Sequence, residues 1–202
     1  YYDMCKHPLA EINDVKELMK HPFPEGDDPG RFKSMKKMAE KYFKEEKVAY
    51  ILGRDTPGIL ELSLWLRGFE NFLTDLLLNP GLAEAIIDII TEHKLKFWEK
   101  ALKEVGENVL IISKADDLAT QDGPIISIDM YRKFIKPRFK KIIEFIKKNA
   151  KAKVYIFYHS CGAVKQFIPD LRECGIDILN PVQVSARGMD TKELKKLYKL
   201  QK

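Results

Sequence analysis

His159 and Cys161 stand two residues apart at the end of an apolar run, in the stretch "VYIFYHSCGAV" (residues 154–164). Side chains alternate along a β-strand, so residues i and i+2 share a face and these two side chains project together. An imidazole and a thiolate side by side suit zinc, which accepts nitrogen and sulfur ligands in a tetrahedral shell. Two other interpretations stay open: a buried cysteine beside a hydrogen-bonded histidine, and a cysteine nucleophile with a histidine base.

Two ligands do not complete a zinc site, because zinc in proteins takes three or four protein ligands. Cys174 is the only later cysteine, and it stands at the end of an expected helix, where a small buried residue is ordinary. Cys5 and His7 lie in an irregular segment that the pattern does not place. The sequence therefore predicts zinc ligation by His159 and Cys161, and it predicts that this chain binds zinc poorly without a further ligand.

Polar side chains also follow the neighbouring expected strands. We expect catalytic roles for Asp116 and Asp117 in "ADDLATQDG", as acid or base, as a partner of a metal-bound histidine, or as a contact for a cationic substrate. Turn and cap chemistry is the alternative for these two aspartates. The residues expected to bind substrate lie at the end of an expected strand or in the loop after one: Gln121, Asn180, Gln183 and Arg187.

The elements that would position these residues alternate between strands and helices. The expected strands are apolar runs at residues 48–53, 108–113, 153–159 and 176–180. The expected helices have helical spacing or caps, at about 13–20, 32–43, 56–78 (as one helix or a pair), 80–106, 127–149, 163–174 and from 190. Because the strands are apolar throughout, we expect a parallel sheet with both faces covered by crossover helices.

Two architectures fit this order equally, an open doubly wound sheet and part of a (β/α)8 barrel. No G-x-G-x-x-G follows any expected strand, which removes the usual nucleotide-binding form of the first. A full barrel takes about 250 residues, so a barrel requires this chain of 202 residues to be a fragment. In either case the strand ends after residues 53, 113, 159 and 180 are expected along one edge of the sheet, where ligands bind.

Composition limits the class of protein and its partners. The hydrophobic share of 45% and the charged share of 32% are typical of a globular protein. The net charge of +5 is spread along lysine-rich helices, as on a solvated surface rather than a nucleic-acid site. Three widely spaced cysteines predict no disulfide framework, and charged residues interrupt every long apolar stretch. We therefore expect a cytoplasmic protein with no nucleic-acid or membrane partner.

Over most of its length the chain resembles the uroporphyrinogen decarboxylase superfamily. The resemblance is carried by "HPFPEGDDPGRF", "LRGFENFLTDLLLNPGLAEAIID", "ADDLATQDGPIIS…MYRKFIKPRFKKI" and "YHSCGAVKQFIPDLRECGIDILNPVQVSARGMD". It implies a (β/α)8 barrel, present here as a partial barrel, and a single domain over residues 1–202 that is incomplete at both ends. The methyltransferase branch binds zinc through an H-x-C pair and a later cysteine. His159 and Cys161 match that pair, and the later cysteine would lie beyond Lys202.

The resemblance also implies a function and its cofactors. It favours a zinc-dependent methyltransferase that moves a methyl group between a corrinoid and a thiol or a methylated small molecule. Zinc and a corrinoid would be the cofactors, and a corrinoid carrier protein would be a partner. One alternative is uroporphyrinogen III decarboxylase, a carboxy-lyase of porphyrin and heme biosynthesis, whose diagnostic N-terminal positions would lie before Tyr1. The other alternative is a non-catalytic tetrapyrrole-binding barrel.

Overall fold

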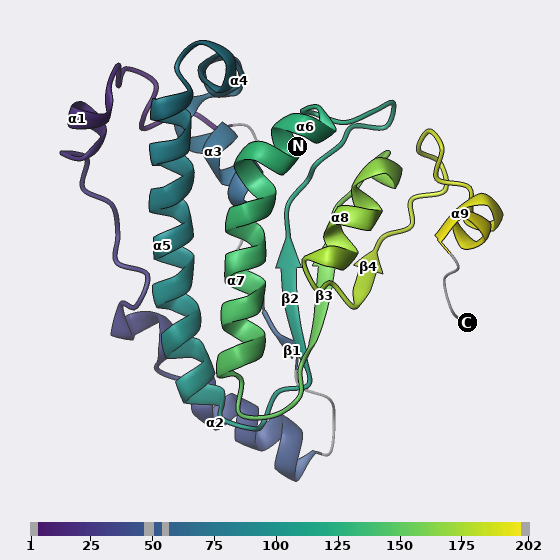
Figure 1. Cartoon of the computed structure of the whole chain (residues 1–202). Coiled ribbons are helices and arrows are strands. Elements are labelled where there is room, and N and C mark those ends of the chain that lie inside the picture. The colour runs from purple at the N-terminus through teal and green to yellow at the C-terminus, as the bar shows by residue number, and fades with distance from the viewer. Residues whose placement is uncertain (1–3, 47–50, 54–56, 199–202) are drawn as a thin grey trace.

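Four parallel strands form one sheet in the computed structural model, which describes residues 4–46, 51–53 and 57–198. The strands are β1 (Ile51–Leu52), β2 (Ile111–Ala115), β3 (Tyr155–His159) and β4 (Ile178–Asn180), and each pairs with the next one along the chain (Figure 1). A doubly wound sheet reverses its strand order at a switch point. The described strands show no reversal, so the fold is an α/β fold whose parallel sheet grows in one direction.

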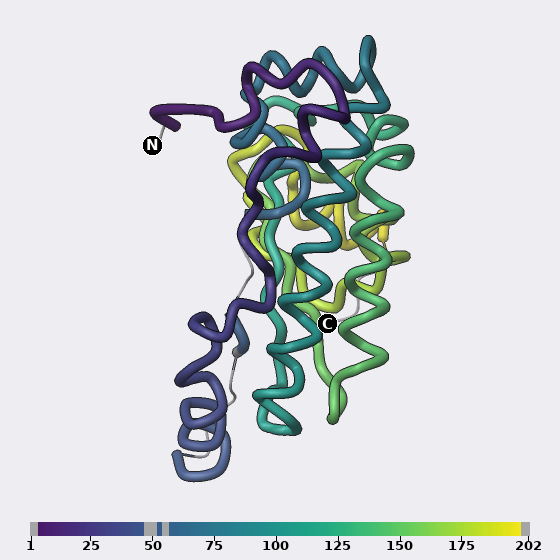
Figure 2. The backbone as a smooth tube through the Cα atoms, turned by 90° about the vertical axis from the view of Figure 1, so that its left-hand side faces the viewer, coloured from purple at the N-terminus to yellow at the C-terminus, as the bar shows by residue number. Residues whose placement is uncertain are grey.

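Helices join the strands and cover one face of the sheet. Figure 2 turns the view by 90° and shows the long helices α5 (teal) and α7 (green) to one side of the strands.

None of the helices in the described residues is long and apolar enough to cross a membrane. In chain order the connecting elements are α1 (Val15–Leu18), the 3-10 turn η1 (Pro29–Phe32), α2 (Met35–Glu40), the π-helical turn η2 (Lys41–Glu45), α3 (Ile59–Arg67), α4 (Phe69–Leu78), α5 (Pro80–Val105), α6 (Ile128–Met130), the π-helical turn η3 (Tyr131–Ile135), α7 (Lys136–Asn149), the 3-10 turn η4 (Lys165–Phe167), α8 (Ile168–Glu173) and α9 (Thr191–Tyr198).

The helix-covered face of the sheet holds the core. Ile156 in β3 is fully buried, and Tyr158, two residues later, packs its ring 5.1 Å from the ring of Phe139 in α7. Lys114 in β2 points the same way and lies over the ring of Trp98 in α5, with the Nζ atom 4.8 Å from the ring centroid. A lysine can occupy this apolar layer because the indole face attracts its ammonium group. The strands are therefore anchored on α5 and α7 through every second side chain.

The other face of the sheet is not covered by helices in the described residues, so the prediction of two covered faces is wrong here. Tyr155 and Ile178 are exposed on this face, and Phe157 and His159 are half-buried. The apolar runs in the sequence do not distinguish the faces, because both carry large hydrophobic side chains. His159 belongs to this open face.

The strand boundaries differ from those predicted. β2 was expected at residues 108–113 but runs from Ile111 to Ala115, because Asn108 closes a turn on α5 through its N–H to the carbonyl of Val105. β3 and β4 begin two residues later than expected and end where predicted, and β1 is confirmed at Ile51–Leu52, with residues 48–50 outside the described residues.

Local sequence signals place most helix ends correctly. Ser127 caps α6 as predicted, accepting a hydrogen bond from the N–H of Met130, and Asp190 likewise accepts from the N–H of Glu193 ahead of α9. Asn79 precedes α5 as expected, but its side chain makes no cap bond to the helix. The helix expected over 127–149 contains the π-helical turn η3 just before Pro137, where the missing proline N–H interrupts the regular helix ladder.

We predict that the two faces of the sheet differ in their contribution to stability. Ile156→Ala removes a fully buried side chain from the helix-covered face of the sheet and is expected to lower the free energy of unfolding by about 2–5 kcal/mol. Ile178→Ala is the matched control on the open face, where the side chain is 38% exposed, and is expected to cost clearly less. Urea denaturation measures both, and equal losses would contradict the assignment of the core face.

Candidate metal centre

The C-terminal ends of three neighbouring strands meet at one edge of the sheet. The register pairs Ala115 with His159 and His159 with Asn180, so the chain leaves β2, β3 and β4 at the same level. This confirms that the loops "ADDLATQ" and "HSCG" lie on one edge. Ligand sites of parallel α/β folds are built at this edge.

His159 and Cys161 contact each other as the i, i+2 spacing predicts. The Nε2 atom of His159 lies 3.3 Å from the Sγ atom of Cys161. The other ring nitrogen, Nδ1, lies 2.8 Å from the Oδ1 atom of Asn180 in β4. The imidazole is therefore held on its β4 side and presents Nε2 to the thiol.

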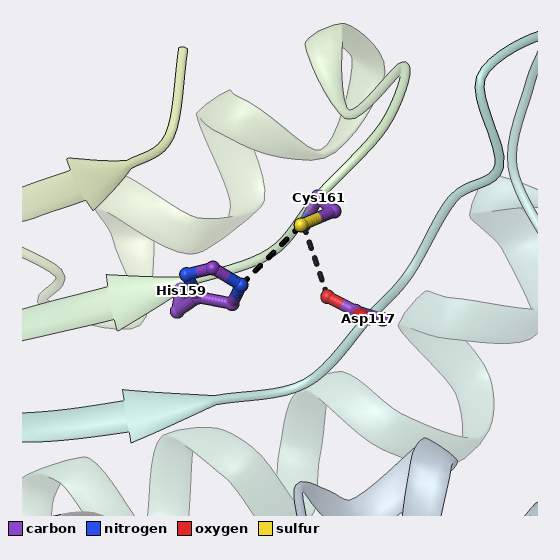
Figure 3. Close-up of side chains that lie close together, drawn as sticks. All are labelled: Asp117, His159 and Cys161. Atoms are coloured by element: carbon purple, nitrogen blue, oxygen red, sulfur yellow. Dashed lines mark hydrogen bonds between the residues drawn. The ribbon is translucent and has the colours of Figure 1, made fainter. Parts of the chain in front are cut away.

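Asp117 completes a cluster with these two residues. Figure 3 shows its carboxylate coming from the loop after β2 toward Cys161, whose thiol also faces the imidazole. One ligand atom from each of Asp117, His159 and Cys161 fits within 4.8 Å of the others, and all three residues are half-buried. Oxygen, nitrogen and sulfur donors of this kind are a set that zinc accepts.

The sequence did not identify Asp117 as a metal ligand, although it predicted a functional role for it. The relevant signal was the strand boundary. With β2 ending at Ala115 instead of residue 113, Asp117 stands two residues beyond the strand, as Cys161 stands two beyond His159. The expectation of a missing third ligand concerned cysteines and did not consider carboxylates, and it stays a prediction beside the donor that Asp117 offers.

The ligand loop after β3 is held by hydrogen bonds from both neighbouring loops. The N–H of Ser160 donates to the carbonyl of Asn180, and the N–H of Cys161 donates to Oδ1 of Asp117 at 2.9 Å. The N–H of Gly162 then donates to Oε1 of Gln183 at 2.7 Å, and the N–H of the next residue, Ala163, donates to the carbonyl of Thr120. The Ser160 hydroxyl in turn accepts from the N–H of Leu118. The β2 and β4 loops thus fix the β3 loop from opposite sides.

The close packing of the loop after β3 against the loop after β2 requires a glycine at position 162. Its φ of +84° is in the region that favours glycine. A Cβ atom there would collide with the carbonyl oxygens of Ala119 and Thr120. The close approach of the β2 loop to the ligand loop therefore depends on a residue without a side chain.

Asp116 faces away from the ligands and anchors the loop to helix α3. Its two carboxylate oxygens each accept a backbone N–H at 2.9 Å, one from Leu60 and one from Glu61, in the first turn of α3. The residue is 3% exposed. Burial raises the pKa of Asp116 to about 7, although the two N–H donors favour the charged form. This placement favours a positioning role, and the catalytic role stays a prediction.

The four residues expected to bind substrate lie around the cluster but differ in their contacts. Asn180 contacts His159, and Gln183 holds the N–H of Gly162. Gln121 and Arg187 are both exposed, and the N–H of Arg187 donates to the Gln121 carbonyl, which ties the β2 and β4 loops together outside the ligands. Substrate binding by any of the four stays a prediction.

The other two cysteines lie outside the cluster. Cys174 is buried at the end of α8, and burial raises the pKa of its thiol to about 11, against the thiolate that a metal needs. Cys5 is exposed in the N-terminal segment. The expectation that Cys174 is a small buried residue is confirmed.

Comparison with known proteins identifies the family. A sequence model described as Uroporphyrinogen decarboxylase (URO-D) matches residues 4–192. The chain belongs to the uroporphyrinogen decarboxylase family. It is 27% identical over 135 residues to Methylcobamide:CoM methyltransferase MtaA of Methanosarcina barkeri, an alignment that covers 64% of this chain and 37% of that protein. The recognition of the family from the sequence is therefore confirmed, and this relative is a methyltransferase.

A solved structure agrees with the fold. The structure of a methyltransferase from Methanosarcina mazei superposes with a TM-score of 0.60 and 20% sequence identity, covering 86% of this chain and 47% of that one. The chain thus spans less than half the length of both relatives.

We predict that Gly162→Ala disrupts the ligand loop. The new methyl group meets two carbonyl oxygens and the backbone is strained, so the free energy of unfolding should fall by at least about 2 kcal/mol. Gly123→Ala is the matched control in the neighbouring loop, because nothing lies within 4 Å of a Cβ atom there. Thermal unfolding measures the difference. The same melting temperature for both variants would contradict the close packing of the two loops at Gly162.

The raised pKa of Asp116 predicts that the stability of the protein depends on pH. Its pKa is about 7 in the folded protein and about 3.9 in an unfolded chain, so between these values the folded state holds a proton that the unfolded state has lost. The contribution of Asp116 is therefore fully present below pH 4 and is lost as the pH rises through 7. The stability of the wild type should fall over this range relative to that of Asp116→Asn, which has no such proton. Chemical denaturation at several pH values tests this, and parallel curves would contradict it.

Proposed function

We propose that this protein is a methyltransferase whose metal centre holds zinc through Asp117, His159 and Cys161. The observation that carries the proposal is the convergence of oxygen, nitrogen and sulfur donors from two strand ends within 4.8 Å. Three protein ligands leave a position for a substrate, as in catalytic zinc sites. Zinc bound here would lower the pKa of a thiol that joins it, so that the thiol is available as a thiolate nucleophile near neutral pH.

The residues of the chain have separate tasks in this proposal. Cys161 supplies a thiolate and His159 supplies Nε2 toward the cation. Asp117 uses Oδ1 to accept the N–H of Cys161, which leaves Oδ2 to face the cation. Asp116 holds the neighbouring backbone against α3 and keeps Asp117 in place.

The reaction we propose is transfer of a methyl group between a corrinoid and a thiol or a methylated small molecule. The methyltransferase relative, with 27% identity, supports the reaction class, and its name indicates a methylated corrinoid as donor and coenzyme M as acceptor in that protein. A corrinoid carrier protein as partner is part of the same proposal. So is the closed (β/α)8 barrel, of which four parallel strands in chain order would be one section.

Decarboxylation of a porphyrinogen is the second candidate, and the description of the matching family favours it. The two candidate functions differ in their need for metal, because decarboxylation of a porphyrinogen would require no zinc. A protein that consumes a methylated corrinoid in a zinc-dependent manner would support the first candidate. Carbon dioxide release from uroporphyrinogen III by metal-free protein would support the second.

We predict that zinc content follows the three ligands. The protein, expressed with zinc and dialysed, should retain about one zinc ion, whereas Cys161→Ser, His159→Ala and Asp117→Asn should lose it. Each loss should exceed the about 10–100-fold in affinity that removal of a ligand's hydrogen-bond partner costs. Cys5→Ser is the matched control, because Cys5 is exposed and outside the cluster. Equal zinc in all variants, or none in the wild type, would reject this metal centre.

A further inference from the structure

We infer that Asn180 is a positioning residue that fixes the tautomer of His159, so that the proton is on Nδ1 and the lone pair of Nε2 faces the cluster. The part of this inference that concerns a metal rests on the proposed function. The part that concerns the tautomer applies to the metal-free protein as well. It gives Asn180 a contact with the imidazole in addition to the expected contact with a substrate, which stays a prediction.

The contact is short and its partners are set by the sheet. Nδ1 of His159 and Oδ1 of Asn180 are 2.8 Å apart, a normal hydrogen-bond length. The two residues are paired in the parallel register of β3 and β4, and paired residues place their side chains on the same face. The carbonyl of Asn180 also accepts the N–H of Ser160. Backbone and side chain of Asn180 thus hold residues 159 and 160 together.

The chemistry of an amide oxygen decides where the imidazole proton is. An amide oxygen only accepts hydrogen bonds, so Nδ1 must be the donor and carry the proton. A neutral imidazole has one N–H, so Nε2 then has a free lone pair. Nε2 is the nitrogen that lies 3.3 Å from Sγ of Cys161 and on the side of Asp117. In the metal-free protein this lone pair can accept the thiol proton of Cys161, and a cation can replace that proton.

The opposite tautomer would disable the cluster. A proton on Nε2 would point at the thiol and at the position between the three donors, and a cation could not bind the ring from that side. An imidazole free in water favours the Nε2–H form, so the protein must impose the other form. Among the described residues, Asn180 supplies the hydrogen bond that does so.

An asparagine is suited to this task because it is neutral. A carboxylate at the same place would accept the same proton but would also add a negative charge beside a cluster that already contains Asp117 and the Cys161 sulfur. The amide therefore orients the ring without changing the charge of the site. This distinction makes Asn180→Asp and Asn180→Ala informative variants, since the first keeps an acceptor oxygen and the second removes it.

The experiment measures the histidine tautomers directly. The metal-free protein is labelled with ¹⁵N-histidine, and long-range ¹H–¹⁵N spectra distinguish Nδ1–H from Nε2–H rings. The chain has four histidines, so His159→Gln assigns the signal of interest by its disappearance. We expect His159 to be the Nδ1–H form in the wild type and in Asn180→Asp. We expect Asn180→Ala to move the proton at least partly to Nε2. Asn149→Ala, at the exposed end of α7, is the matched control and should change nothing.

Zinc affinity is measured in the same variants by competition with a chelator. Asn180→Ala should weaken binding about 10–100-fold, as expected when the hydrogen-bond partner of a metal-bound histidine is removed. Asn180→Asp should stay within a few-fold of the wild type. An Nε2–H form in the wild type would overturn the inference. So would an Nδ1–H form that persists in Asn180→Ala with unchanged zinc affinity. If the tautomer responds to Asn180 but the wild type binds no zinc, the proposed function fails while the assignment of Asn180 stands.

Discussion

The candidate site depends on the hydrogen bonds that hold the loop after β3. Successive N–H groups of this loop donate first to one neighbouring segment and then to the other. Four consecutive N–H groups, from Ser160 to Ala163, donate in turn to the last residue of β4, the loop after β2, the loop after β4 and the loop after β2. A loop tied in this way cannot shift without breaking bonds on both sides. Cys161 is therefore held beside Asp117 and His159 without an ion, as the proposed metal site would require.

One face of the sheet holds the buried core, and the other face carries His159 of the candidate site. On the helix-covered face Ile156 is buried and Tyr158 packs against Phe139 of α7, and the open face presents His159. Alternation along β3 links the two tasks, because fixing Tyr158 in the core fixes the direction of His159. The hydroxyl of Tyr158 extends this link, since it donates to the carbonyl of Asp116. Core packing and loop position are thus coupled at the residue before the first ligand.

The sequence was sufficient for the parts of the site that follow from spacing along one strand. The contact between His159 and Cys161 follows from i, i+2 alternation, and the parallel sheet with crossover helices follows from the succession of apolar runs and helices. The order of the strands did not follow from this pattern, which fits a doubly wound sheet and a barrel section equally. The proximity of Asp117 to His159 and Cys161 did not follow, because it depends on where β2 ends and how it pairs with β3. The predicted second strand ended at residue 113, and Lys114 and Ala115 extend β2 beyond it. A lysine in a core strand was not expected, because its contact with the ring of Trp98 is visible only in the structure. The inward anchor at Asp116 was missed for a similar reason, since its partners Leu60 and Glu61 are distant in the chain.

The most direct test of this account is a crystal structure of the protein with zinc, with anomalous scattering measured at the zinc absorption edge. The account predicts one strong peak at the edge of the sheet, bonded to Nε2 of His159, Sγ of Cys161 and a carboxylate oxygen of Asp117 at about 2.0–2.3 Å. It also predicts that Asn180 remains hydrogen-bonded to Nδ1 in that structure. A peak coordinated through Nδ1, a peak without Asp117, or zinc found only at other residues would contradict it.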